Sequence, residues 1–200
     1  MVGLVLLAAL PGGTGCLKPT GATTTPSGRP LQSPKLNPFI YFEEGRALFI
    51  AVDGRAAQYT KSGTIFPLGL GLVNLGKTGL TFSAESFILE TSDGAHYPVV
   101  SVEEYNREYK RSRTDRRLGD SFDEVMLTRF RNYNLIDWTL FPFAGQGAAS
   151  QQLLELERGY WTRNHIYFPI PETGIHGQNF SLLVRAKESP ETYVVRFFLR

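Results

Sequence analysis

The sequence predicts a mainly β fold, an antiparallel β-sandwich with one helical insertion over about residues 102–132. Three observations support this prediction. Short apolar runs, several of them alternating, are separated by turns rich in Gly, Pro, Asp and Asn. No strand–helix–strand rhythm recurs, which disfavours a parallel α/β sheet. The chain has 200 residues, of which 42% are hydrophobic and 12% aromatic, and this is enough for the core of one domain.

The strands of the first half are expected to begin at Phe39. One of them alternates leucine with Gly69 and Gly71, which is typical of a half-buried strand. Because these glycines lie within a strand, we expect them to allow close backbone approach rather than to bind a nucleotide. Pro98 predicts an edge strand. The expected strands cover residues 39–42, 47–52, 64–75, 80–90 and 96–102.

The helical insertion is predicted from side-chain spacing. Tyr105 and Tyr109 are four residues apart, and apolar residues from Phe122 to Phe130 recur every three or four positions. Asp120-Ser121, followed by two carboxylates, resembles the start of a helix. Extended structure then returns over residues 136–143, 150–157 (strand or helix), 160–170, 180–186 and 192–199, with the last two forming a hairpin or a neighbouring pair.

Residues 1–15 are predicted to be a signal peptide. Nine mostly apolar residues from Val2 to Leu10 would span about 14 Å as a helix, too little to cross a bilayer core of about 30 Å. A run of this length fits the apolar core of a secretory signal. Pro11 and two glycines then break the helix, and small residues lead to Cys16, the single cysteine of the chain.

This arrangement resembles a bacterial lipoprotein signal, which implies that Cys16 is lipidated and becomes the new N-terminus. Residues 17–38, rich in Pro and Thr, are expected to form a disordered tether. The resemblance implies a protein of the bacterial cell envelope, anchored on the periplasmic or outer side, with the outer membrane favoured over the inner one. The alternatives are an ordinary signal peptide of a secreted protein, or a buried apolar terminus with an incidental cysteine.

The remaining domain, residues 39–200, resembles immunoglobulin-like (telokin-like) domains of uncharacterised bacterial lipoproteins. The resemblance covers about residues 64–101 and 155–200. It depends on the turn after Asn74, the Ser92-Asp93-Gly94 turn and the apolar strand that ends at Ile170-Pro171. It implies an immunoglobulin-like sandwich, with the charged 102–132 segment as a departure from the usual short connection.

Catalytic and metal-binding patterns are weak. A single cysteine excludes an intrachain disulfide or a cysteine-based zinc site, and the three histidines are dispersed, so we expect no metal and no cofactor. Gly119-Asp120-Ser121-Phe122 resembles the start of a GDS-type serine hydrolase. No Asp-x-x-His follows Ser121, as that family requires, and helix capping explains the same residues.

The most distinctive polar feature is a basic segment. Two tyrosines are interleaved with it, and it is interpreted either as a docking surface for a partner or as a solvated helix face. The second interpretation is favoured by the balance of charge over residues 103–124, which contain six basic and seven acidic residues. The candidate partner-binding residues are Tyr105, Arg107, Tyr109, Lys110, Arg111, Arg113, Arg116 and Arg117.

The sequence therefore predicts a non-enzymatic, exported, lipid-anchored envelope protein that serves as a protein-interaction or structural module. A net charge of +2 gives no reason to expect nucleic acid as a partner, and no small-molecule substrate is identified. A carbohydrate- or peptidoglycan-binding module is the alternative, with a stacking platform drawn from Trp138, Tyr160, Trp161, Tyr167 and Phe168. A serine hydrolase using Ser121 is the third hypothesis.

Overall fold

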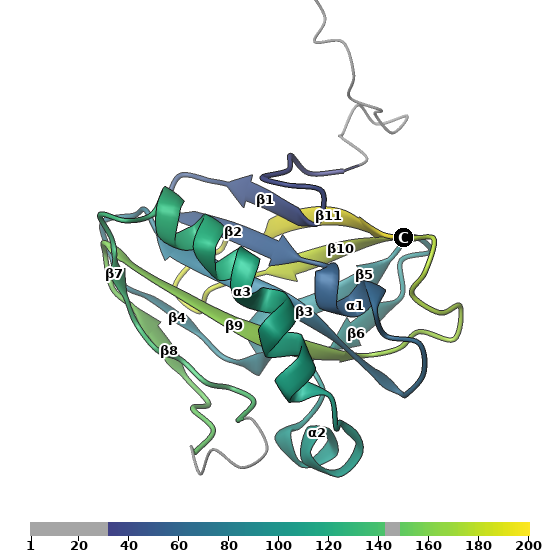
Figure 1. Cartoon of the computed structure of the whole chain (residues 1–200). Coiled ribbons are helices and arrows are strands. Elements are labelled where there is room, and N and C mark those ends of the chain that lie inside the picture. Colours follow the sequence, from purple (N-terminus) through teal and green to yellow (C-terminus); the bar gives the residue numbers. More distant parts are fainter. Residues whose placement is uncertain (1–31, 143–148) are drawn as a thin grey trace, which may run out of the picture.

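The computed structural model describes residues 32–142 and 149–200, and these ranges are mainly β (Figure 1). One sheet has five strands in the order β1-β2-β3-β9-β7, a second has four in the order β11-β10-β5-β6, and β4 pairs with β8 in a separate two-stranded sheet. The strands are β1 (Ile40–Glu44), β2 (Leu48–Asp53), β3 (Ile65–Asn74), β4 (Leu80–Phe82), β5 (Phe87–Thr91), β6 (His96–Pro98), β7 (Asn134–Leu135), β8 (Leu154–Leu156), β9 (Tyr160–Pro169), β10 (Gln178–Val184) and β11 (Tyr193–Leu199).

The two longer helices lie where the insertion was expected. A short helix α1 (Arg55–Gln58) follows β2, and the insertion itself contains α2 (Val102–Glu108) and α3 (Ser112–Arg129). The mainly β class and the helical insertion are thus confirmed. The expected helix start at Asp120-Ser121 is wrong, because both residues lie inside α3. The side chain that caps a helix in this region is Ser101, whose hydroxyl accepts a hydrogen bond from the Glu104 amide at the start of α2.

Two expectations about the strands need correction. The sheets are antiparallel except at one edge, where β7 runs parallel to β9. The single strand expected over residues 80–90 is two strands in different sheets, because a 3-10 turn at Ala84–Ser86 interrupts it. The Ser86 hydroxyl accepts a hydrogen bond from the Ser83 amide at 3.0 Å and stabilises this turn. Edge position is confirmed for β6, which contains Pro98.

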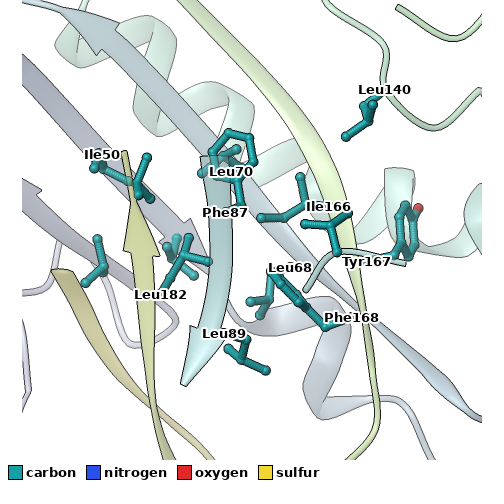
Figure 2. Close-up of a cluster of buried hydrophobic side chains, with 14 of the residues drawn as sticks. Ile50, Leu68, Leu70, Phe87, Leu89, Leu140, Ile166, Tyr167, Phe168 and Leu182 are labelled. Carbon is teal, nitrogen blue, oxygen red and sulfur yellow. The ribbon is translucent and has the colours of Figure 1, made fainter. Parts of the chain in front are cut away.

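The two larger sheets share one apolar core. Figure 2 shows Ile50 and Leu68 of the five-stranded sheet together with Phe87, Leu89 and Leu182 of the four-stranded sheet. These side chains are fully buried, and they alternate along their strands with residues of the opposite face, as the period of a strand requires. The structure is therefore sandwich-like, with apolar side chains of both sheets meeting in the middle.

The outer face of the five-stranded sheet is covered by α3 (Figure 1). Phe122 and Met126 of the helix pack against this face, where β3 presents Gly69 and Gly71. A Cβ atom on Gly71 would lie 2.6 Å from Met126 Cε, so only glycine lets the helix approach this closely. Every residue of β3 is buried, which corrects the expectation of a half-buried strand and confirms the predicted role of the glycines.

The described chain begins in a segment that was assigned to the tether. The Ser33 amide donates to the Arg196 carbonyl oxygen of β11 at 2.9 Å, and the Arg196 amide donates back to the Ser33 hydroxyl at 2.8 Å. Lys35 forms a bridge with Tyr41 of β1. Residues 33–36 therefore contact the free edges of both large sheets, and the ordered chain starts before Phe39. Unpaired edge groups explain this, because they attract any extended segment nearby.

Candidate functional site

The six basic side chains expected to dock a partner lie on α2, on α3 and on the connection between them. Arg111 is half-buried and the other five are exposed. One of the exposed side chains is already engaged, because Arg107 Nη2 forms an ion pair with Glu108 Oε1 at 2.9 Å. The Lys110 ammonium donates to the Asn106 carbonyl oxygen at 3.0 Å. The structure thus gathers these cations on the outer surface of the two helices.

The two tyrosines of the predicted docking set are not available to a partner. Tyr105 is 2% exposed and Tyr109 is 8% exposed. Both pack on Tyr167 of β9, with ring centroids 4.6 Å and 4.8 Å from it. The spacing of four residues that predicted a helix face therefore marks the face that α2 buries. The prediction is corrected for these two residues.

A buried carboxylate lies against this tyrosine cluster. Asp115 of α3 is fully buried, and the Tyr109 hydroxyl donates a hydrogen bond of 2.6 Å to its Oδ2. Burial raises the pKa of Asp115 to about 6, although the Tyr109 hydrogen bond and the charge of Arg111 lower it in part. Asp115 Oδ1 and the hydroxyls of Tyr105 and Tyr167 are buried without a hydrogen-bond partner. Each tyrosine hydroxyl can donate or accept a hydrogen bond, whereas Oδ1 of an ionised Asp115 can only accept.

Ser121 is not placed as a catalytic nucleophile. Its hydroxyl accepts a hydrogen bond from the Arg55 guanidinium. Two of the three histidines are engaged elsewhere. His96 Nε2 bonds Glu90, and the two ring nitrogens of His176 bond backbone carbonyl oxygens. The third, His165, packs beneath α3, where a Cβ atom on Gly119 would lie 3.1 Å from its Cε1 atom. Within the described ranges no histidine hydrogen-bonds Ser121, so the arrangement that the hydrolase hypothesis requires is not formed.

A polar hollow of about 310 Å³ lies between α3 and β9. Two residues that line it form an ion pair, with Arg163 Nε and Asp123 Oδ2 2.7 Å apart. His165 lines the same hollow, and burial lowers its pKa to about 4, so the ring is neutral at physiological pH. Burial also raises the pKa of Asp123, because desolvation outweighs the opposing charge of Arg163. The Arg163–Asp123 pair links the helix to the sheet.

A second hollow, of about 450 Å³, lies on the other side of the segment that contains Asp137 and Trp138; we call it the β8 groove. One wall is formed by residues 136–138 and the other by the chain around β8. The residues that line the β8 groove are Ile136, Asp137, Trp138, Gln151, Leu153, Leu154, Glu155, Glu157 and Tyr160. The two hollows share Asp137 and Trp138.

The stacking platform of the carbohydrate hypothesis is not present. Trp138 and Trp161 are 3% and 1% exposed, and Tyr167 and Phe168 are fully buried. Tyr160 alone among the five aromatic candidates is half-buried. A sugar ring stacks on an exposed aromatic face, and these side chains face the interior instead. The interpretation of these aromatics as a platform is therefore wrong.

Cys16, the proposed signal peptide 1–15 and most of the tether lie outside the described residues. In the described ranges, histidine, cysteine and carboxylate side chains form no group of three or more suited to hold a metal ion. No helix in the same part of the chain has the length and apolar character needed to cross a bilayer.

Sequence reasoning did not find the Asp115 cluster or the β8 groove. Asp115 stands among arginines in a charged segment, and nothing in that pattern signals burial. A weak signal for the groove was present, because Leu153, Glu155 and Glu157 alternate with Leu154 and Leu156 as exposed and buried sides of a strand do.

The comparisons with known proteins find similarity in structure but not in sequence. No family model and no curated protein matches it. Similar solved structures include ycdA, a candidate lipoprotein of Bacillus subtilis, at 10% identity and a TM-score of 0.43, covering 79% of this chain and 38% of that one. A protein of unknown function from Listeria monocytogenes has 11% identity and a TM-score of 0.41, covering 80% of this chain and 82% of that one. The chain thus spans 38% of the length of the Bacillus protein.

A third similar structure is a DUF4426 family protein from Pseudomonas aeruginosa, at 11% identity and a TM-score of 0.32, covering 80% of this chain and 97% of that one. At such identities and TM-scores, the three likenesses carry no argument about what this chain does.

Proposed function

We propose that the chain is a non-enzymatic, exported module of the bacterial cell envelope, held to a membrane by a lipid on Cys16 and acting by docking another envelope protein. The observation that carries this proposal is the position of Cys16, between an apolar run and a tether rich in Pro and Thr. The end of that tether is built into the domain, where Ser33 pairs with Arg196 of β11. The tether therefore joins the domain at a defined place.

The place where the tether joins the domain supports a docking role. Residues 33–36 contact β1 and β11, and β7 lies at the opposite edge of the five-stranded sheet, four strand spacings or about 19 Å away. The exposed arginines of α3 are on the helix layer that covers one face of this sheet (Figure 1). Because the tether joins the domain at the β1 edge, residues 33–36 do not cover the helix layer or the β7 edge.

Three finer assignments belong to the same proposal. Residues 1–15 act as a signal peptide that is removed before Cys16, the two-sheet domain belongs to the immunoglobulin-like class, and the protein resides at the outer membrane in preference to the inner one. A secreted protein without lipid is the alternative. The non-enzymatic part is supported by Ser121, whose hydroxyl is bound by Arg55 rather than by a histidine.

Membrane fractionation of a bacterium that expresses the full chain tests the anchor. The native sequence is expected in the membrane pellet after a carbonate wash, and Cys16→Ser is expected in the soluble fraction. If both proteins fractionate alike, the anchor is refuted.

Co-purification from the same membranes tests the docking face. Charge reversal at Arg113, Arg116 and Arg117 is expected to remove a salt-sensitive partner, while the protein stays in the membrane. Charge reversal at Arg46, Lys61 and Lys77, which are also exposed but lie in loops outside α2 and α3, is the matched control. An unchanged set of partners in the first variant would refute the basic face as the docking surface.

A further inference from the structure

The β8 groove has the form of a slot between two extended segments. Its walls are residues 136–138, which follow β7 of the five-stranded sheet, and the chain around β8, which pairs with β4 alone. At one end the slot is closed by the Gln151 amide, which donates to the Thr139 carbonyl oxygen at 2.7 Å. At the other end it is closed by the turn before β9, where the Tyr160 amide donates to the Glu157 carbonyl oxygen at 3.1 Å. These two hydrogen bonds therefore mark the two ends of the slot.

The floor and one wall of the β8 groove are apolar. Trp138 and Leu154 are buried beneath it, Ile136 and Tyr160 are half-buried, and Leu153 is 51% exposed. Leu153 thus offers apolar surface at the mouth of the hollow that an apolar side chain of an occupant would remove from water. Trp138 is fixed in place, because its indole Nε1 donates to the Gln151 carbonyl oxygen at 3.0 Å.

The rim of the β8 groove is acidic. Asp137, Glu155 and Glu157 all line it, and no lysine or arginine does. Within residues 32–142 and 149–200, none of these three carboxylates forms an ion pair, and they are not grouped closely enough to hold a metal ion. Three unpaired like charges around one hollow repel each other, and a cationic occupant would relieve that repulsion.

Strand geometry directs these groups to the same side. Successive side chains of a strand alternate between faces, so Leu153, Glu155 and Glu157 project together, while Leu154 and Leu156 project into the core. Glu155 is the exposed residue of β8, and Leu153 and Glu157, which flank the strand, are exposed as well, so one apolar and two acidic side chains follow each other at every second residue. An extended peptide has the same repeat, which lets its alternate side chains meet this row in register.

We propose that the β8 groove docks an extended cationic segment of a partner protein, with lysine or arginine side chains on Asp137, Glu155 and Glu157 and an apolar side chain on Leu153 and Tyr160. This inference deepens the proposed function, on which it rests, by naming the chemistry of a partner. It concerns a site separate from the arginines of α3 and a partner of opposite charge.

The test uses the full chain purified in detergent and two labelled peptides, acetyl-Lys-Leu-Lys-Leu-Lys-amide and acetyl-Glu-Leu-Glu-Leu-Glu-amide, with binding followed by fluorescence anisotropy. The cationic peptide is expected to bind and the anionic one is not. Combined substitution Glu155→Gln and Glu157→Gln is expected to weaken binding about tenfold, and raising the salt concentration to weaken it similarly. Leu153→Ser is expected to weaken it at least about threefold.

Matched controls are available on other surfaces. Glu103→Gln with Glu172→Gln removes two exposed carboxylates, and Leu127→Ser removes a leucine that is 47% exposed on α3. These variants are expected to leave the affinity unchanged. All substituted side chains are exposed, and an unchanged thermal midpoint verifies that each variant folds.

Three binding results would overturn the proposal: no binding of the cationic peptide, equal binding of both peptides, or equal affinity of the groove and control variants. Concentration-dependent dimers that are lost in the Glu155→Gln and Glu157→Gln protein would identify a second copy of the chain as the occupant, and would also overturn it. Because the assay is independent of membrane location, its failure is distinguishable from failure of the Cys16 anchor.

Discussion

Replacement of Asp115 by asparagine is expected to stabilise the folded protein at neutral pH. Asp115 is fully buried, and its Oδ2 accepts a hydrogen bond from Tyr109, whereas its Oδ1 has no partner. Asparagine has nearly the same shape, keeps an oxygen acceptor for Tyr109 and adds an NH₂ donor for the neighbouring tyrosine hydroxyls. It also removes a charge that burial disfavours.

The sign and size of the effect follow from the pKa of Asp115, which is raised from 3.8 to about 6. Between these values the folded state binds a proton that the unfolded state has released, so stability falls as the pH rises from about 4 through 6. A shift of roughly 2 pKa units corresponds to about 3 kcal/mol in the free energy of unfolding. We therefore compare the free energy of unfolding of Asp115→Asn with that of the native protein. The difference, in favour of the variant, is expected to be about 3 kcal/mol larger above pH 7 than near pH 4.

Urea unfolding of both proteins between pH 4 and pH 8 measures this difference, since other titrating groups cancel in the comparison. Asp120→Asn on the same helix is the control, because it removes an exposed carboxylate outside the tyrosine cluster. The reasoning is refuted if the difference between the native and Asp115→Asn proteins does not change with pH, or if the variant loses stability at pH 8 relative to pH 4.

Three further predictions concern the fold. Gly71→Ala places a methyl group against Met126 and is expected to reduce the free energy of unfolding by about 1–3 kcal/mol, measured by urea denaturation. Ser33→Ala removes the acceptor of the Arg196 amide and should cost about 1 kcal/mol and speed hydrogen exchange at that amide; unchanged exchange would contradict it. Burial lowers the pKa of His165 from 6.5 to about 4, so its neutral form contributes stability above pH 6.5 that is lost as the pH falls through 4. His165→Gln should flatten this acid limb, and an unaltered limb would count against it.

Much of the strand pattern could be predicted from the sequence because alternation is a local property. Leucines at every second position identified β3, and the glycines between them predicted the close approach that α3 makes. The Ser92-Asp93-Gly94 turn marked the end of β5. The division of residues 80–90 between two sheets was not predictable in the same way, since it depends on one serine hydroxyl at Ser86.

Long-range packing explains what the sequence did not reveal. The spacing of Tyr105 and Tyr109 correctly indicated one face of a helix, but only the position of β9 shows that this face is buried on Tyr167. The burial of Asp115 has the same origin. The β8 groove depends on two segments about 15 residues apart in the chain, one that follows β7 and one around β8, and no local pattern contains this relation.

The central claim is that a lipid on Cys16 holds this domain at a membrane, and intact-mass measurement of the protein extracted from a bacterium that expresses the full chain tests it most directly. We predict a mature chain that begins at Cys16 and carries the added mass of a lipid on that residue. A mature protein in which Cys16 is unmodified would contradict the claim.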